Sequence, residues 1–172
     1  MTKNELTALL DRLGIIPSRK RGQNFLIDPN MLDALVAPSS PVAGDNVVEV
    51  GAGPGNLTVR LAATGAKVTA IEIDRRFADY LEERFASARN VQVIGDDACR
   101  LDYDALFGGD RWRCISNLPY AATSPLLFRF LEQRCPPADM FIVVQREVAN
   151  RLAAAPASKA YGALTVRVQL HY

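Results

Sequence analysis

The chain has 172 residues, of which 49% are hydrophobic and 23% are charged, and its formal net charge is +1. This length and apolar content are enough for one domain with a sizeable core, and the near-zero charge excludes the plainly basic balance of a dedicated nucleic-acid-binding protein. No apolar run is long enough to cross a bilayer, and residues 1–13 carry charges inside their apolar pattern, unlike a secretory signal. We therefore expect no membrane association and a cytoplasmic location.

Cysteine and histidine usage gives no sign of a metal site. Cys99, Cys114 and Cys135 are odd in number and widely spaced, and His171 is the one histidine. This set supports neither a disulfide framework nor a zinc site, so we expect no metal and interpret the cysteines as small buried hydrophobic residues.

Two helices are predicted in the N-terminal part of the chain. The first spans the leucines of residues 6–13, which share one helical face, and Gly14 ends it. The second opens at Asp28-Pro29, where an aspartate N-cap precedes a proline suited to the first helical position. Residues 22–27 are then a loop between the two helices, and residues 38–46 are a linker rich in Pro, Ser and Gly.

Residues 47–58 carry a ligand-binding signal. A short apolar run breaks into a turn with Gly51, Gly53 and Gly55, and an amphipathic helical pattern follows. Alternate glycines let the backbone approach a ligand, and the helix start behind them presents free N–H groups. The dinucleotide fingerprint G-x-G-x-x-G would need glycine where Asn56 stands, and Glu49 precedes the turn. This turn resembles motif I of the class I S-adenosylmethionine methyltransferases, although other mononucleotide folds share such a turn.

Strand and helix patterns alternate from residue 47 onward. This alternation predicts an α/β fold with a doubly wound, mostly parallel sheet. Residues 164–170 alternate between apolar and polar, which argues for a strand, although the same residues can form an amphipathic helix. The predicted strands are residues 47–50, 67–73, 91–94, 113–116 and 140–144, and helices are predicted at 77–85, from Ser124-Pro125 to 130, and from Arg146.

Acidic residues follow the second and third predicted strands, at the sheet edge where ligands of parallel sheets bind. Glu72 follows Gly55 at close to the ~20-residue spacing at which an acid reaches the ribose hydroxyls of a nucleotide. The alternative for Glu72, a surface acid that caps the next helix, suits Asp74 better. Asp96 and Asp97 lie where a carboxylate accepts from an adenine amine, and we expect one of the two to be a cap instead.

Asn117-Leu118-Pro119-Tyr120 is the most informative stretch. An asparagine at a strand end, a proline-stiffened turn and an aromatic residue present carbonyl acceptors beside a flat stacking surface. Such a site suits a planar base with an exocyclic amine, whose nitrogen becomes more reactive when acceptors favour its tetrahedral form. Positioning and preorganised dipoles then lower the barrier to methyl transfer without a histidine base.

With these motifs together, the chain resembles the ribosomal RNA adenine N6-dimethyltransferases of the KsgA (RsmA) type, with the erythromycin-resistance methyltransferases as relatives. The resemblance covers nearly the whole chain. Its pieces are Gln23-Asn24-Phe25-Leu26, residues 49–55, Ile71-Glu72-Ile73-Asp74, Asp97-Ala98, residues 117–120, Gln145-Arg146-Glu147-Val148 and residues 158–162.

The resemblance implies a Rossmann-like catalytic domain over residues 1–172, with a helical flank at 1–45 and the core at 46–172. It implies that Asp97 rather than Asp96 reads the cofactor adenine, that residues 117–120 are catalytic and that Tyr120 stacks on the target base. It also implies that the last strand pair, a loop that closes over the base and a helical C-terminal domain lie beyond Tyr172. The implied S-adenosylmethionine contacts are Gln23, Asn24, Leu26, Glu49, Gly51, Gly53, Gly55, Glu72, Asp97 and Asn117.

Basic residues indicate where RNA would be held. Arg19-Lys20-Arg21 form one run, and Arg146 and Arg151 lie in the last quarter of the chain, although any such cluster can be an ordinary solvated surface. We expect a monomer whose partner is small-subunit ribosomal RNA in the 30S precursor.

The function that the sequence favours is the transfer of methyl groups from S-adenosylmethionine to the N6 amines of adenines in small-subunit ribosomal RNA. A ribosome-assembly module with secondary catalysis would keep the same motifs. A methyltransferase for large-subunit RNA or DNA would share the chemistry of residues 117–120. Residues 145–152 and 158–162 favour the small-subunit group over the latter.

Overall fold

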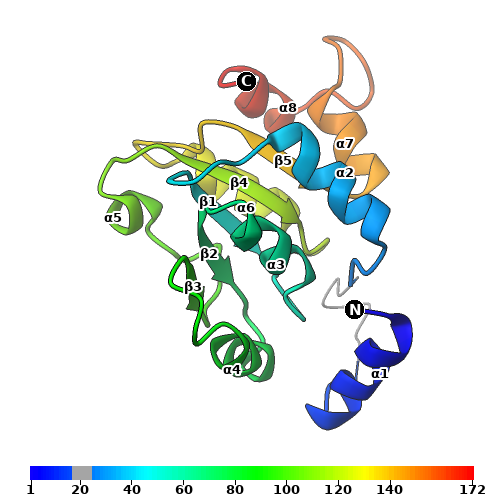
Figure 1. Ribbon diagram of the computed structural model, residues 1–172. Helices are drawn as coiled ribbons and strands as arrows, with labels where there is room; N and C mark the ends of the chain where they lie inside the picture. The colour runs from blue at the N-terminus through cyan, green and yellow to red at the C-terminus, as the bar shows by residue number, and fades with distance from the viewer. Residues whose placement is uncertain (17–24) are drawn as a thin grey trace.

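The computed structural model describes residues 1–16 and 25–172. Its centre is a five-stranded sheet in the order β3-β2-β1-β4-β5, and every neighbouring pair is parallel. Helices cover the sheet on both sides (Figure 1). This confirms the predicted doubly wound architecture. The elements are α1 (Lys3–Arg12), α2 (Pro29–Ser39), β1 (Asn46–Val50), α3 (Asn56–Ala63), β2 (Lys67–Ile71), α4 (Arg75–Arg84), β3 (Val91–Ile94), α5 (Tyr103–Phe107), β4 (Trp112–Asn117), α6 (Thr123–Leu131), β5 (Met140–Val143), α7 (Arg146–Leu152) and α8 (Ala163–Gln169).

The strand order places a switch point beside β1. The chain moves outward from β1 to β2 and β3, and then returns to pair β4 with the other side of β1. In such a sheet the loops after β1 and β4 diverge, and they leave a crevice at the carboxyl ends of the strands.

Several helix boundaries follow the predicted caps. The Asp28 side chain accepts from the amides of Asn30 and Met31 and opens α2, and the Asp74 side chain accepts from the amide of Arg76 and opens α4. Residues 164–169 belong to α8 and Leu170 is its C-cap, so the helical alternative is confirmed there.

Several elements differ from the prediction, including β2, which ends at Ile71 rather than at residue 73. Helix α2 continues through Pro38 to Ser39, so the linker begins later than expected. Helix α6 has Ala122 as its N-cap, and Ser124 and Pro125 lie in its first turn, where the missing proline N–H costs no helical bond. The pattern gave no sign of α5, whose five residues are too few to show a helical period.

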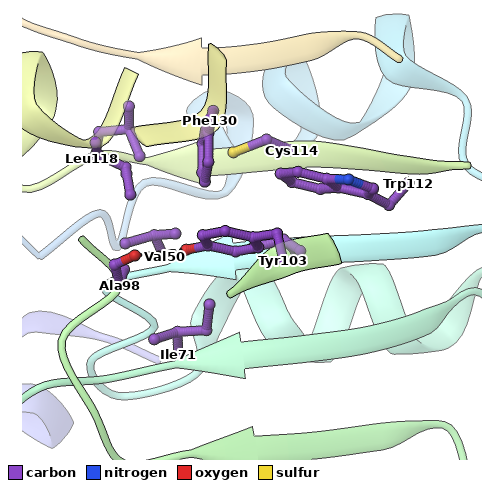
Figure 2. Close-up of a cluster of buried hydrophobic side chains, with 10 residues drawn as sticks. Val50, Ile71, Ala98, Tyr103, Trp112, Cys114, Leu118 and Phe130 are labelled. Carbon is purple, nitrogen blue, oxygen red and sulfur yellow. Dashed lines mark hydrogen bonds between the residues drawn. The ribbon is translucent and has the colours of Figure 1, made fainter. Parts of the chain in front are cut away.

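The core on one side of the sheet is built around Trp112. Its ring stacks on Tyr103 with centroids 5.0 Å apart, and Phe130 meets both rings edge-on. Figure 2 shows Phe130 beside Cys114, and Tyr103 beside Val50 of β1. The Tyr103 hydroxyl donates to the carbonyl of Ala98 at 2.9 Å, so this core also supports the loop after β3.

The opposite side holds a second apolar cluster in which leucines of α2 and α3 meet β1, β2 and β4. Helix α1 belongs to neither of these two clusters. Its buried leucines form a further cluster with Ile15, which follows α1, and with Phe77 of α4. No helix in the described part of the chain is long and apolar enough to cross a membrane.

Candidate active site

A cavity of about 830 Å³ lies at the carboxyl ends of the strands, in the crevice that the strand order creates. Its wall includes the glycine turn after β1, the residues after β2 and β3, and the start of the segment after β4. Two carboxylates, Glu49 and Glu72, lie in this wall and are 3% and 6% exposed. The structure therefore brings together residues from four strands that the sequence analysis had singled out.

The glycines of the turn have different neighbours. Gly53 has a φ of +52°, and a Cβ there would lie 3.3 Å from the Phe25 ring. A Cβ on Gly51 would lie 2.8 Å from Cγ of Pro119, so this glycine lets the turn after β1 approach the turn after β4. Gly55 is outside the cavity wall, and a Cβ there would lie 2.7 Å from Leu81. Only Gly51 and Gly53 of the three thus face the cavity.

Glu72 ties the glycine turn to the end of β2. One carboxylate oxygen accepts from the amide of Gly53 at 2.8 Å, and the other accepts from the amide of Asp74 at 2.9 Å. Burial raises the pKa of Glu72 above its ordinary value, and these two amide donors oppose that rise by stabilising the carboxylate. The Ile73 amide also lowers the pKa. The carboxylate lines the cavity, where it can accept from a ligand hydroxyl.

Glu49 is less exposed than Glu72 and is the next-to-last residue of β1, just before the glycine turn. The Thr58 hydroxyl of α3 donates to it at 2.6 Å. Complete burial raises the pKa of Glu49 from 4.5 to about 8, and the nearby charge of Glu72 adds to the rise. At neutral pH this side chain is therefore largely a neutral acid that can donate a hydrogen bond.

The two aspartates after β3 both line the cavity. Asp96 accepts from the amide of Asp97 at 2.7 Å, and Asp97 accepts from the amide of Cys99 at 3.0 Å. Each carboxylate therefore shapes the local turn, and Asp97 is the less exposed of the two.

The stretch after β4 places Asn117, Leu118 and Pro119 in the cavity wall. The Pro119 carbonyl accepts from the Ala122 amide and from the Thr123 hydroxyl, each at 3.0 Å. Both of its lone pairs are thereby used inside the turn. Tyr120 is half-buried beside this turn and is not one of the residues that line the cavity.

The cavity residues that had no assigned role in the sequence analysis include Phe25, Asn56 and Ile73. Ile73 is 69% exposed although it stands between two acids at a strand end. An apolar residue in that position was a usable signal for a flat ligand surface. Asn56 had been noted only as the residue that breaks the dinucleotide fingerprint.

Part of the predicted site lies outside the described residues, namely Gln23, Asn24, Arg19, Lys20 and Arg21. Leu26 is described and lines the cavity. Arg146 and Arg151 are exposed on α7 and do not line the cavity. Among the described residues, no three His, Cys, Asp or Glu side chains gather in a way that could hold a metal ion.

Comparison with known proteins identifies close relatives. The chain is 43% identical to the ribosomal RNA small subunit methyltransferase A of Pelotomaculum thermopropionicum over 171 residues, which cover 94% of this chain and 58% of that protein. The protein of the same name from Alkaliphilus oremlandii is 41% identical over 158 residues, covering 90% of this chain and 55% of the relative. The chain thus spans a little more than half the length of these relatives.

Solved structures agree with this relationship. A dimethyladenosine transferase from Plasmodium falciparum superposes with a TM-score of 0.74 at 30% identity, covering 86% of this chain and 52% of that one. The 23S rRNA methyltransferase ErmE superposes with a TM-score of 0.70 at 26% identity, covering 83% and 56%. The family model described as ribosomal RNA adenine dimethylase matches residues 18–172. The chain therefore belongs to the ribosomal RNA adenine dimethylase family.

Proposed function

We propose that this chain is the catalytic part of an enzyme that transfers methyl groups from S-adenosylmethionine to adenine N6 amines of small-subunit ribosomal RNA. The observation that carries the proposal is the convergence of the glycine turn, the strand-end carboxylates and Asn117 on one cavity in a member of this family. The curated relatives named above as small-subunit methyltransferases support this substrate over large-subunit RNA.

The cavity fits S-adenosylmethionine in size and chemistry. Its volume of about 830 Å³ lies within the range of small-molecule sites. We assign the ribose hydroxyls to the Glu72 carboxylate and the adenine amine to Asp97, because both residues line the cavity. We assign the flat faces of the adenine to apolar residues such as Ile73. Leu26, Glu49, Gly51, Gly53 and Asn117 complete the described part of the proposed cofactor site.

When bound, the cofactor supplies an electrophilic methyl group on its sulfonium sulfur. The chain must place the adenine amine in line with that methyl and accept hydrogen bonds from the N–H groups of the amine. The Pro119 carbonyl is already used within its turn, so we assign this task to the Asn117 amide oxygen and the Leu118 carbonyl. As the nitrogen–methyl bond forms and the sulfur–methyl bond breaks, the amine loses one proton to solvent. Tyr120 is proposed to stack on the base from the rim of the cavity.

We further propose a monomer that works in the cytoplasm on 30S precursors, with residues 1–45 as its flank and residues 46–172 as its core. Exposed Arg146 and Arg151 would contact phosphates, which position RNA without reading its sequence.

The decisive test is methyl transfer from labelled S-adenosylmethionine to purified small subunits that lack adenine dimethylation, followed by mapping of the labelled nucleotides. We expect label on adenine N6 of small-subunit RNA. Label confined to large-subunit RNA added in parallel would reassign the substrate. Cofactor binding without any label would favour an assembly module.

A further inference from the structure

One wall of the cavity comes from the segment that follows the N-terminal helix rather than from the sheet. Phe25 and Leu26 both line the cavity. The Phe25 ring lies against Gly53 of the glycine turn and 5.4 Å, between ring centroids, from Phe77 of α4. This pair of residues therefore reaches the glycine turn from outside the Rossmann-like core.

A polar contact joins this wall to the end of the glycine turn. The side-chain amide of Asn56 donates to the Leu26 carbonyl at 3.1 Å. Asn56 is the first residue of α3 and is 6% exposed, so the bond is shielded from competing water. A glycine here, as in the dinucleotide fingerprint, would leave the Leu26 carbonyl without this donor.

The chain on either side of the wall is anchored independently. Upstream, the leucines of α1 and Ile15 pack with Phe77, and Arg76 donates to the carbonyl of Gly14 at 2.6 Å. Downstream, α2 belongs to the apolar core, and the Arg60–Asp33 ion pair at 2.7 Å joins it to α3. Phe25 also packs against the α1 cluster and Leu26 against the cluster of α2 and α3, so the Asn56 amide adds a polar contact to a wall that apolar packing joins to both helices.

We infer that Asn56 is a positioning residue that holds Phe25 and Leu26 as a wall of the cofactor cavity, and that α1 sets the same wall from outside the cavity. The ligand named here rests on the proposed function. Helix α1 lies before residue 18, where the match to the family model begins.

Asn56→Ala tests the contact, and Asn46→Ala is its matched control. The side-chain amide of Asn46 also donates to a backbone carbonyl, that of Arg111, at 3.1 Å. Asn46 is the first residue of β1 and so lies at the amino ends of the strands, whereas the cavity lies at their carboxyl ends. For Asn56→Ala we expect S-adenosylhomocysteine to bind about 3- to 10-fold more weakly by calorimetry, as for one buried hydrogen bond. Without ligand, amide hydrogen exchange over residues 25–28 should become faster. Asn46→Ala should change neither readout.

A second variant separates positioning from direct contact with the ligand. Leu10 is 8% exposed, packs within the α1 cluster and does not line the cavity. Leu10→Ala should also accelerate exchange over residues 25–28 and weaken S-adenosylhomocysteine binding. Because both changes act through one wall, the double variant should weaken binding by less than the product of the two single effects.

The outcomes are distinct. Weaker binding in Asn56→Ala with unchanged exchange over residues 25–28 would mean that Asn56 touches the ligand directly, which overturns the inference. Unchanged binding and exchange would overturn it as well. If the unmodified chain does not bind S-adenosylhomocysteine, the proposed function fails, whereas the exchange measurements still decide whether Asn56 and α1 hold the wall.

Discussion

At the scale of single residues, the site depends on acids whose surroundings change their chemistry. Glu49 and Glu72 belong to the same cavity wall, but the Glu72 carboxylate accepts from the backbone amides of Gly53 and Asp74, whereas Glu49 accepts from the Thr58 hydroxyl. At Glu49 the rise in pKa caused by burial outweighs the lowering by the hydrogen bonds from Thr58. The resulting pKa of about 8 makes the stability of the fold depend on pH.

The direction of that dependence follows from the proton count. Between the ordinary pKa of 4.5 and the folded value of about 8, the folded chain binds a proton on Glu49 that the unfolded chain releases. Glu49 thus lowers the stability progressively as the pH rises from about 5 to 8. Glu49→Gln keeps an acceptor for Thr58 but cannot ionise. We predict that the free energy of unfolding of this variant changes over the same pH range by at least ~1 kcal/mol less than that of the unmodified chain.

Urea unfolding at pH 5, 6.5 and 8 would measure this difference. The difference between the two chains reports Glu49 together with its electrostatic coupling to Glu72, whose pKa is raised in the same direction. Parallel stability curves for both chains would show that Glu49 is already ionised in the folded state at pH 5.

Gly53 allows a second test at this scale. Gly53→Val should abolish S-adenosylhomocysteine binding, because the new side chain meets Phe25 and forces a left-handed backbone on a β-branched residue. Gly108→Val is the matched control: its φ is +61°, and nothing lies within 4 Å of the added Cβ. Both variants should lose stability, but only Gly53→Val should lose binding in calorimetry. Equal binding in the two variants would mean that the backbone at Gly53 does not approach the ligand.

For catalysis, Asn117→Ala should lower the rate of methyl transfer at saturating cofactor by at least ~100-fold, as expected when a preorganised polar contact to the transition state is lost. Its affinity for S-adenosylhomocysteine should change much less. Initial rates with undermethylated small subunits, at equal cofactor occupancy, would measure both effects. A normal rate in Asn117→Ala would remove Asn117 from the activation of the amine.

At the scale of elements, the helices after β3 and β4 support the site through the aromatic core. Helix α5 supplies Tyr103, which stacks on Trp112 and holds the Ala98 carbonyl in the loop next to Asp97. Helix α6 supplies Phe130, which meets both rings edge-on. Packing far from the cavity thereby fixes where the loop after β3 leaves the sheet.

We predict that Phe130→Ala lowers the free energy of unfolding by about 3 to 5 kcal/mol, the usual cost of a large buried aromatic side chain. Phe128→Ala on the same helix should cost less, because Phe128 is only partly buried. Trp112 is the one tryptophan in the chain, so its fluorescence during urea unfolding reports on this core directly. Equal losses for the two variants would show that the edge-on contacts of Phe130 contribute little.

At the scale of the whole molecule, positive and negative charges are nearly balanced. A formal net charge of +1 gives little long-range attraction to RNA. The proposed RNA contact would then rely on local cations such as Arg146 and Arg151 on α7, which are exposed.

We therefore predict weak and salt-sensitive binding of this chain to small-subunit ribosomal RNA. A plot of log affinity against log salt should have a slope of about −0.7 for each phosphate contacted in single-stranded regions. Arg151→Gln should make that slope shallower by about 0.7, the contribution of one phosphate contact. Arg111 is an exposed cation at the amino end of β4, and Arg111→Gln should leave the slope unchanged. Filter binding over a salt series would measure this. Identical slopes for the two variants would place the RNA surface elsewhere.

The sequence alone determined the alternation of strands and helices, the caps at Asp28 and Asp74, and the acids and Asn117 at the strand ends. These features are local: a buried parallel strand needs an apolar run, a helix needs its period and cap, and a tight turn needs glycine. The family resemblance likewise rested on short motifs of adjacent residues, and the comparisons confirmed it.

The tertiary structure decided what these groups touch. Gly55 faces Leu81 instead of the cavity, the Pro119 carbonyl is used within its own turn, and Asn56 reaches back to Leu26. The separation of Asn56 and Leu26 along the chain hides their contact from any local pattern. The pKa of Glu49 depends on burial by residues from several elements, and helix α5 is too short to have a period. Such properties arise only when distant segments pack together, so no motif of neighbouring residues encodes them.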